Sequence, residues 1–452
     1  MIQKKFLHRK SRFFDAARLI VLGFTLIIFT GAGLLCLPFA SKGDPIYFID
    51  ALFMATSATC VTGLAVVTPF TTFTVFGQIV LLFLIQLGGI GVMALTSFFY
   101  LAFSRRVTLA SRLTMNEDIT DGNIKHIRRV VYRILAMTFG AELIGAIILS
   151  GAFSQYMEAG RAVWCGIFTS ISAFCNAGID IFNMPESSLV SFNSDPLVIL
   201  TVSFLIIVGG IGFLVVSDMW DAKTWRHYKL HTKIVLTVTA CLILFGTCFF
   251  LGVEFNNDAT LGTMSVGDKI LNAYFQSVTA RTAGFNSIDL AAMNTSSHIC
   301  LDFLMFIGAS PGSTGGGIKT TTLFILITTV TSVISRRKCA IIDKQKIGLF
   351  TVHKASAVFM LASTIMVLST MVLSISDPQF TLSQLLFEQI SAYATVGLSL
   401  GITAQLSVVG KLVIMSSMFL GRIGALTFFV SLSRKKVVRE DDIQYPECSI
   451  NI

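Results

Sequence analysis

Eight apolar runs constrain this sequence more than any other feature. They cover residues 19–40, 77–102, 130–151, 197–217, 234–251, 299–334, 355–375 and 412–432. A helix needs about 20 apolar residues to cross the hydrocarbon core of a bilayer. Only 13% of the residues are charged, whereas ordinary soluble domains contain about 25%. The sequence therefore predicts an all-α membrane protein with eight membrane spans.

Four shorter apolar stretches lie between successive spans. They cover residues 49–60, 163–175, 270–282 and 385–395. A helix of this length is too short to cross a bilayer. Backbone that enters the membrane without crossing it must line a cavity or be buried in protein. We therefore expect four re-entrant segments, one between the two spans of each pair.

Each short stretch leads into a glycine through a similar sequence. The four glycines, 115, 106 and 113 residues apart, are Gly63, Gly178, Gly284 and Gly397. A phenylalanine stands ten residues before the glycine in three copies, and Phe275 stands nine residues before Gly284. A period of this size is typical of duplicated structural units. We predict four units, each built as span, pore helix, extended segment and span (M1–P–M2), around one pseudo-four-fold pore.

A second glycine marker follows within the second span of each unit. It begins at Gly88, Gly209, Gly315 and Gly421. Small residues in membrane helices often serve close helix packing, and we favour that interpretation for the first two clusters. The third cluster belongs to residues 308–317, where Pro311 and five glycines cannot continue a regular helix. We expect a broken helix there.

The broken segment also has part of the spacing of a phosphate-binding loop. Gly312 and Gly317 are correctly spaced, but Ile318 stands between Gly317 and the Lys319-Thr320 pair. A phosphate-binding loop also follows a β-strand in a soluble α/β domain, which this sequence does not predict. We therefore expect no nucleotide site and no bound cofactor.

Most of the 34 Lys and Arg residues fall in five segments, which share one side of the membrane if there are eight spans. The acidic residues concentrate in the opposite loops, so both termini are predicted to be cytoplasmic. No basic segment is long enough to form a soluble nucleic-acid-binding domain. The predicted plan is a basic arm at 1–18, units at 19–102, 130–217, 234–334 and 355–432, cytoplasmic loops at 103–129, 218–233 and 335–354, and a cytoplasmic tail at 433–452.

Such a pore favours cations for electrostatic reasons. A short re-entrant helix points the negative end of its dipole toward the membrane centre. The extended segment that follows can present backbone carbonyls in place of the hydration water of an ion. No set of His, Asp or Glu residues has catalytic or metal-binding spacing. The pattern therefore indicates cation conduction and no enzyme.

These motifs together resemble the Trk/Ktr/HKT superfamily of K⁺ transporters, and the bare eight-span plan resembles its Ktr-type membrane subunits. The resemblance rests on the four covalent units, on Thr282-Ala-Gly-Phe285 in the third loop and on the Gly-rich break. It implies a K⁺ selectivity filter of Val61, Thr62, Gly63, Asn176, Ala177, Gly178, Thr282, Ala283, Gly284, Thr395, Val396 and Gly397. It also implies a gate of Gly308, Ala309, Ser310, Pro311, Gly312, Ser313, Thr314, Gly315, Gly316, Gly317 and Arg422.

The same resemblance implies the partners. It implies a homodimer with one pore per subunit, in a bacterial plasma membrane, controlled by a cytosolic ring of RCK-type subunits that bind ATP or ADP. It also implies activation by Na⁺. No loop reads Thr-Val-Gly-Tyr-Gly, as K⁺-channel filters do, so the strictness of K⁺ selection over Na⁺ stays open.

Four charged residues inside apolar segments have open roles. Lys319 either extends to the cytoplasmic interface or faces the protein interior, as a charge in a membrane span must. Arg422 is expected to position the gate, because a guanidinium can bond several carbonyls. Arg281 either repels ions or is a structural brace paired with an acid such as Glu388. Glu142 is the candidate for the alternative function, a symporter that couples K⁺ to Na⁺ or H⁺.

Overall fold

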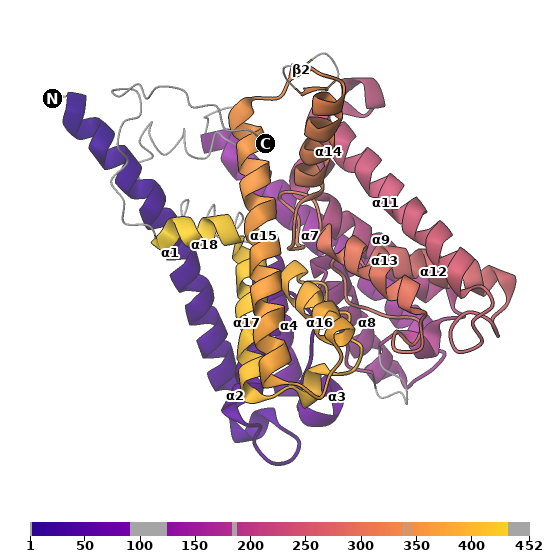
Figure 1. Ribbon diagram of the computed structural model, residues 1–452. Helices are drawn as coiled ribbons and strands as arrows, with labels where there is room; N and C mark the ends of the chain where they lie inside the picture. Colours follow the sequence, from indigo (N-terminus) through magenta and orange to yellow (C-terminus); the bar gives the residue numbers. More distant parts are fainter. Residues whose placement is uncertain (1, 91–123, 183–187, 338–339, 343–344, 433–452) are drawn as a thin grey trace.

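The structure is a computed structural model, and it describes residues 2–90, 124–182, 188–337, 340–342 and 345–432. Four long helices cover the first span of each predicted unit (Figure 1). They are α1 (Ile2–Leu35), α7 (Ile124–Phe153), α11 (Leu230–Glu254) and α15 (Leu349–Ser376). Within the described residues, these four are long and apolar enough to cross a membrane, and two bent helix pairs raise the number to six.

Between 22% and 28% of each of these four candidate spans is buried inside the protein. The remaining surface is apolar. Leu143, Ile144 and Ile147 are exposed on α7, and Val367 and Leu368 are exposed on α15. Helices with such outward-facing apolar surface suit a lipid environment, which needs no polar face. The chain is therefore a multi-pass membrane protein.

Four short helices lie beside the long ones, close to the four predicted stretches. They are α2 (Phe48–Cys60), α8 (Ala159–Cys175), α12 (Val266–Thr279) and α16 (Leu382–Ala394). The side chain of Ser265 caps the start of α12, and Thr381 and Gln384 form a capping box at the start of α16. Both arrangements satisfy backbone N–H groups that a helix start leaves unpaired. The phenylalanines of the repeated pattern are all fully buried: Phe53, Phe168, Phe275 and Phe387.

The second spans are less regular than the sequence predicts. They comprise α4 (Val75–Gly89), α9 (Pro196–Ile211) with α10 (Phe213–Ala222), α13 (Thr295–Phe306) with α14 (Thr320–Ile334), and α17 (Val408–Ile423) with α18 (Ala425–Leu432). The chain bends by 93° between α9 and α10 and again between α17 and α18. A continuous helix was expected at both places, so that expectation is wrong. The bends fall on Gly212 and Gly424, whose φ angles of 100° and 87° lie outside the helical region.

The break in the third pair is wider than predicted. Residues 307–319 separate α13 from α14, whereas the sequence indicated 308–317. Figure 1 shows α18 running from beside α15 across α1 rather than continuing the direction of α17. Arg18 fixes this crossing, because its Nε donates a hydrogen bond of 2.9 Å to the carbonyl of Ser431.

Short elements complete the described chain. They are α3 (Pro69–Thr72), four 3₁₀ turns (Pro38–Ala40, Val190–Phe192, Trp225–His227 and Thr403–Gln405) and an antiparallel strand pair, β1 (Ile341–Ile342) and β2 (Gln345–Lys346). The end of the second predicted span at 91–102, most of the loop at 103–129 and the tail at 433–452 lie outside the described residues.

Candidate functional site: a ring of four glycines

The four glycines of the repeated pattern come together in one closed ring. A Cβ built on Gly63 would meet the carbonyl oxygen of Ala177 at 2.5 Å, and one built on Gly178 would meet that of Ala283 at 2.5 Å. The series continues from Gly284 to the carbonyl of Val396, also at 2.5 Å, and closes from Gly397 to the carbonyl of Thr62. Each glycine therefore faces the carbonyl that precedes the next glycine in the ring, and no side chain fits between them.

The segments around these glycines share one backbone conformation. We call residues 61–63, 176–178, 282–284 and 395–397 the glycine segments. The first residue of each has a positive φ: 55° at Val61, 61° at Asn176, 71° at Thr282 and 53° at Thr395. Non-glycine residues seldom adopt this conformation. Four such residues at equivalent positions mark a constrained backbone of the kind that concentrates at functional sites.

Hydroxyl groups on the short helices bond two of these segments directly and a third through the residue that follows it. Ser57 accepts a hydrogen bond of 3.1 Å from the backbone N–H of Gly63, and Ser391 accepts one of 3.1 Å from Gly397. Ser172 instead donates to the carbonyl of Ile179, at 2.7 Å. All three serines are fully buried. The sequence pattern contained these serines, but it did not predict that they tie the short helices to the glycine segments.

The third segment, whose Phe275 stands one residue closer to its glycine, differs from the other three. Helix α12 ends at Thr279, and its C-cap Ala280 keeps right-handed angles, whereas the residue after α2, α8 and α16 is left-handed. Thr279 replaces the serine here, and its hydroxyl donates to the carbonyl of Phe285 at 2.5 Å. The ring is therefore closed by four similar but unequal segments.

The α13–α14 loop, residues 307–319, lies against the ring on the side where the short helices end. Its Gly316 N–H donates a 3.0 Å hydrogen bond to the hydroxyl of Thr395 in the fourth glycine segment. A Cβ on Gly315 would collide with the hydroxyl of Thr282 in the third segment. Of the ten predicted loop residues, Gly315 and Gly316 thus touch the predicted filter directly.

The loop is also bonded to the end of α9. The N–H groups of Ser310 and Thr314 donate to the carbonyls of Gly210 and Gly209, at 3.1 and 3.3 Å, and Phe213 donates to the carbonyl of Gly312 at 3.0 Å. These carbonyls are accessible because the helix ends at the Gly212 bend. The second glycine cluster, which begins at Gly209 and was interpreted as a helix-packing contact, therefore also anchors the loop.

Two cations contact this loop. Arg422 donates one hydrogen bond to the carbonyl of Thr314 and another to the carbonyl of Gly88 in α4. Lys319 turns back onto the loop, with Nζ 2.7 Å from the carbonyl of Gly315 and 3.5 Å from that of Gly316. Of the two alternatives for Lys319, the inward one is correct, because its ammonium bonds loop carbonyls.

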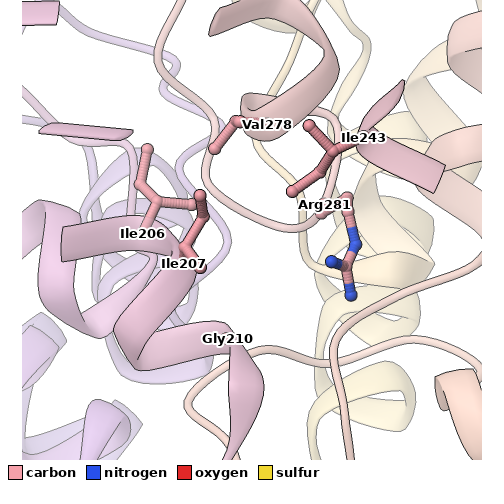
Figure 2. Close-up of a pocket in the computed structure, with 6 residues that line it drawn as sticks. All are labelled: Ile206, Ile207, Gly210, Ile243, Val278 and Arg281. Carbon is pink, nitrogen blue, oxygen red and sulfur yellow. The ribbon is translucent and has the colours of Figure 1, made fainter. Parts of the chain in front are cut away.

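The predicted pairing of Arg281 with Glu388 is wrong. Glu388 instead accepts hydrogen bonds from Ser399 and Thr403. Arg281 is buried and lines a small cavity between α9, α11 and α12, and its Nε atom has no hydrogen-bond partner among the described residues. Figure 2 shows the Arg281 side chain near Ile243, with Ile206 and Ile207 of α9 on the facing wall.

Glu142 is buried between α4, α7 and α8. Its two carboxylate oxygens accept hydrogen bonds of 3.0 and 3.1 Å from the side-chain amide of Gln86. The thiol of Cys175, the residue before the second glycine segment, lies 3.8 Å from the same carboxylate. The two ion pairs found within the described residues do not include Glu142.

Comparison with known proteins identifies the family to which this chain belongs. Residues 3–440 match the family model of TrkH, described as a cation transport protein. The chain belongs to the TrkH family of cation transport proteins. It is therefore a membrane transporter and not an enzyme.

Individual members of the TrkH family resemble the chain over nearly its full length. It is 38% identical to the Ktr system potassium uptake protein B of Bacillus subtilis over 434 residues, which cover 96% of each chain. It is 36% identical to the potassium/sodium uptake protein NtpJ of Enterococcus hirae, again over 96% of each chain. The crystal structure of the potassium transporter TrkH from Vibrio parahaemolyticus superimposes with a TM-score of 0.72 at 19% identity, covering 93% of this chain and 85% of that one. This last likeness concerns the fold.

Proposed function

We propose that the chain is the ion-translocating subunit of a K⁺ uptake system. The names of its relatives support K⁺ as the transported ion, since two of them are a potassium uptake protein and a potassium/sodium uptake protein. In this proposal the four glycine segments form the selectivity filter, from Val61, Asn176, Thr282 and Thr395 to the glycine of each segment.

One observation carries the proposal. The carbonyl oxygens of Ala177, Ala283, Val396 and Thr62 follow one another around a closed ring in which every glycine faces the carbonyl of the next segment. Rings of backbone carbonyls replace the hydration shell of K⁺ in selective pores. The short helices that end at this ring add the negative ends of their dipoles. Both contributions favour a cation over an anion.

The α13–α14 loop would be the gate of this pore. The contacts of Gly315 with Thr282 and of Gly316 with Thr395 support this role, because they place loop backbone against two filter segments. Arg422 would hold the closed position through its bond to Thr314. Opening would require the bond to Thr314 to break, since the same guanidinium also bonds Gly88 and so ties the loop to α4.

The proposed arrangement in the cell follows the charge distribution and the names of the relatives. The clustered Lys and Arg residues support cytoplasmic termini. A name that refers to a Ktr system supports the presence of partner subunits. We propose a homodimer controlled by a cytosolic RCK-type ring that binds ATP or ADP, with Na⁺ as an activator in keeping with the potassium/sodium name of one relative.

A second candidate function is symport of K⁺ with Na⁺ or H⁺. The buried Glu142 favours it, because a carboxylate within a membrane span is by default a functional-site hypothesis. Glu142 contacts Gln86 and Cys175, which precedes the second glycine segment, and not the carbonyls of the ring. For this reason we favour uncoupled conduction.

Growth of a bacterium that lacks its own K⁺ uptake systems tests the proposed function. The chain is expressed alone and together with an RCK-type partner, and growth is measured at low external K⁺. Rescue by the unaltered chain and its loss with Gly397→Ser would support a K⁺ pore with a carbonyl filter. Membrane insertion without rescue under either condition would contradict it.

A further inference from the structure

Glu388 is a buried carboxylate that the ring and the gate do not use. It lies in α16, nine residues before Gly397, and is 1% exposed. Removing a carboxylate from water is unfavourable unless its oxygens accept hydrogen bonds. The identity of the groups that supply these bonds therefore indicates what the residue stabilises.

Among the described residues, the side-chain donors to Glu388 come from the segment just beyond Gly397. The hydroxyl of Ser399 donates to Oε1. The hydroxyl of Thr403 lies 3.2 Å from both carboxylate oxygens and 2.9 Å from the Ser399 hydroxyl. Ser399 in turn accepts a 2.9 Å hydrogen bond from the N–H of Gly401. Glu388 is thus the centre of a network that folds residues 399–403 back onto α16.

Apolar packing holds Ile402 of this segment, which is 3% exposed, whereas Gly401 has little support. A Cβ built on Gly401 would meet no atom within 4 Å, and Gly401 itself is exposed. Hydrogen bonds thus hold the chain on both sides of Gly397, in addition to the bond between the Gly316 N–H and the Thr395 hydroxyl. Ser391 holds the N–H of Gly397 from behind, and Glu388 holds the chain two residues further on.

The other three short helices carry no carboxylate at this place. Met54 and Thr169 stand nine residues before Gly63 and Gly178, and the shifted third copy has Gln276 eight residues before Gly284. A fully satisfied buried polar network fixes a single local conformation more strictly than apolar packing does. The fourth segment is thus the one whose outer end is bonded to a carboxylate at this position of its short helix.

We propose that Glu388 is a positioning residue for ion selectivity, which holds the outer end of the fourth glycine segment through Ser399 and Thr403. The proposal rests on the proposed function, since it assumes that these segments select the ion. Its effect on ions is indirect, because the carboxylate bonds the chain beyond Gly397 and not the ring carbonyls. Loss of the network should make the Val396 carbonyl, which the fourth segment contributes to the ring, more mobile. This change should reduce discrimination between K⁺ and Na⁺.

The test measures uptake of radioactive Rb⁺ into proteoliposomes that contain the purified full chain, with increasing external K⁺ or Na⁺ as competitor. The variants are Glu388→Ala, Glu388→Gln, Ser399→Ala and Thr403→Val. Thr403→Ser retains the hydroxyl and serves as the conservative variant. Glu254→Ala is the matched control, because Glu254 is also fully buried and accepts bonds from Ser297 and Thr260, but at the junction of α11 and α13 away from the ring.

We expect Glu388→Ala to lower the K⁺-over-Na⁺ competition ratio about tenfold, which corresponds to about 1.4 kcal/mol of differential binding. Glu388→Gln and Thr403→Val should lower the ratio less, and Thr403→Ser should leave it at the wild-type value. Glu254→Ala should lower the thermal stability without changing the ratio. If Glu388→Ala fails to fold, Ser399→Ala and Thr403→Val remove the donors and leave α16 intact.

A wild-type ratio in Glu388→Ala, or in both donor variants, would overturn this proposal and leave the proposed function standing. An equal fall of the ratio in Glu254→Ala would also overturn it, because the effect would then be general destabilisation. Absence of Rb⁺ uptake by the unaltered chain would instead contradict the proposed function itself, and with it the role of Glu388.

Discussion

The carbonyl oxygen of Ala177 occupies the space that a side chain on Gly63 would need, since a Cβ built on Gly63 would come within 2.5 Å of it. The same relationship links Gly397 to the carbonyl of Thr62 on the other side of the first segment. The second and fourth segments, each 113 residues or more from the first in sequence, thus contact Gly63 and its neighbour Thr62 through backbone atoms alone. This contact leads directly to a prediction about ion preference.

Gly63→Ser and Gly397→Ser should lower discrimination between K⁺ and Na⁺ by about tenfold or more. The added side chain must displace a ring carbonyl, because no room exists beside either glycine. Competition between K⁺ and Na⁺ for Rb⁺ uptake measures the effect. Gly43→Ser is the control, since Gly43 is exposed and has no atom within 4 Å of a built Cβ. Unchanged ion preference in both ring variants would remove the filter assignment.

Arg422→Ala should increase K⁺ flux in the absence of any activating partner. The guanidinium bonds Thr314 in the loop and Gly88 in α4, and hydrogen bonds to charged groups contribute about 1.5–3 kcal/mol each. Loss of one such bond shifts a closed–open equilibrium by roughly tenfold or more. Flux from proteoliposomes provides the measurement, with Arg133→Ala in the exposed Asp221 ion pair as the control. Lower flux from a well-folded Arg422→Ala protein would argue against a role in closing the pore.

Deletion of residues 309–316 should also raise the flux. The deletion removes the loop backbone that touches Thr282 and Thr395, while α13 and α14 remain. Gly316→Ala is a milder change, because its Cβ would collide with Thr395 and push the loop from the ring. Leak measured without an RCK-type partner should increase in both proteins. A fall in flux with intact folding would mean that the loop does not plug the pore.

Glu142→Gln should leave the K⁺ flux and its dependence on external pH and Na⁺ unchanged. Glutamine keeps an acceptor for the Gln86 amide but cannot carry a proton or a charge. The measurement is K⁺ uptake into proteoliposomes under imposed pH and Na⁺ gradients. Loss of a gradient-driven component in this variant would favour the symport alternative.

Breaking the Lys411–Asp50 ion pair should destabilise the fold and leave ion preference intact. The pair joins α17 to α2, with Nζ 2.7 Å from Oδ1, and the two side chains are 13% and 16% exposed. For such a partly buried pair we expect Lys411→Ala to cost about 1–3 kcal/mol of stability. Thermal unfolding in detergent measures the loss. The charge exchange Asp50→Lys with Lys411→Asp should restore part of it, and full stability of the single variant would show that the pair contributes little.

The sequence predicted the parts of the fold that depend on hydrophobic pattern and repeated spacing. The short helices α2 and α16 begin and end within three residues of their predicted bounds. The one-residue shift of Phe275 was visible in the sequence and coincides with the different end of α12, at Thr279, although no altered segment was predicted from it. These features are local, so a single stretch of sequence contains the information.

Features that depend on distant partners could not be predicted. Gly212 and Gly424 lie in apolar runs that continue past them, so nothing local distinguishes a 93° bend from close packing. Only the equivalent position of the two glycines, each three residues after the start of its cluster, could have signalled them. Glu388 was named as one acid that could pair with Arg281, but the hydroxyls of Ser399 and Thr403 bond that carboxylate instead.

The most direct test of the account is the ion preference of the purified chain in proteoliposomes, measured as Rb⁺ uptake in competition with K⁺, Na⁺ and choline. A carbonyl ring predicts strong competition by K⁺, weaker competition by Na⁺ and none by choline, with the difference between K⁺ and Na⁺ reduced by Gly397→Ser. Equal competition by K⁺ and Na⁺ that Gly397→Ser does not change would contradict the claim that the four glycine segments select K⁺.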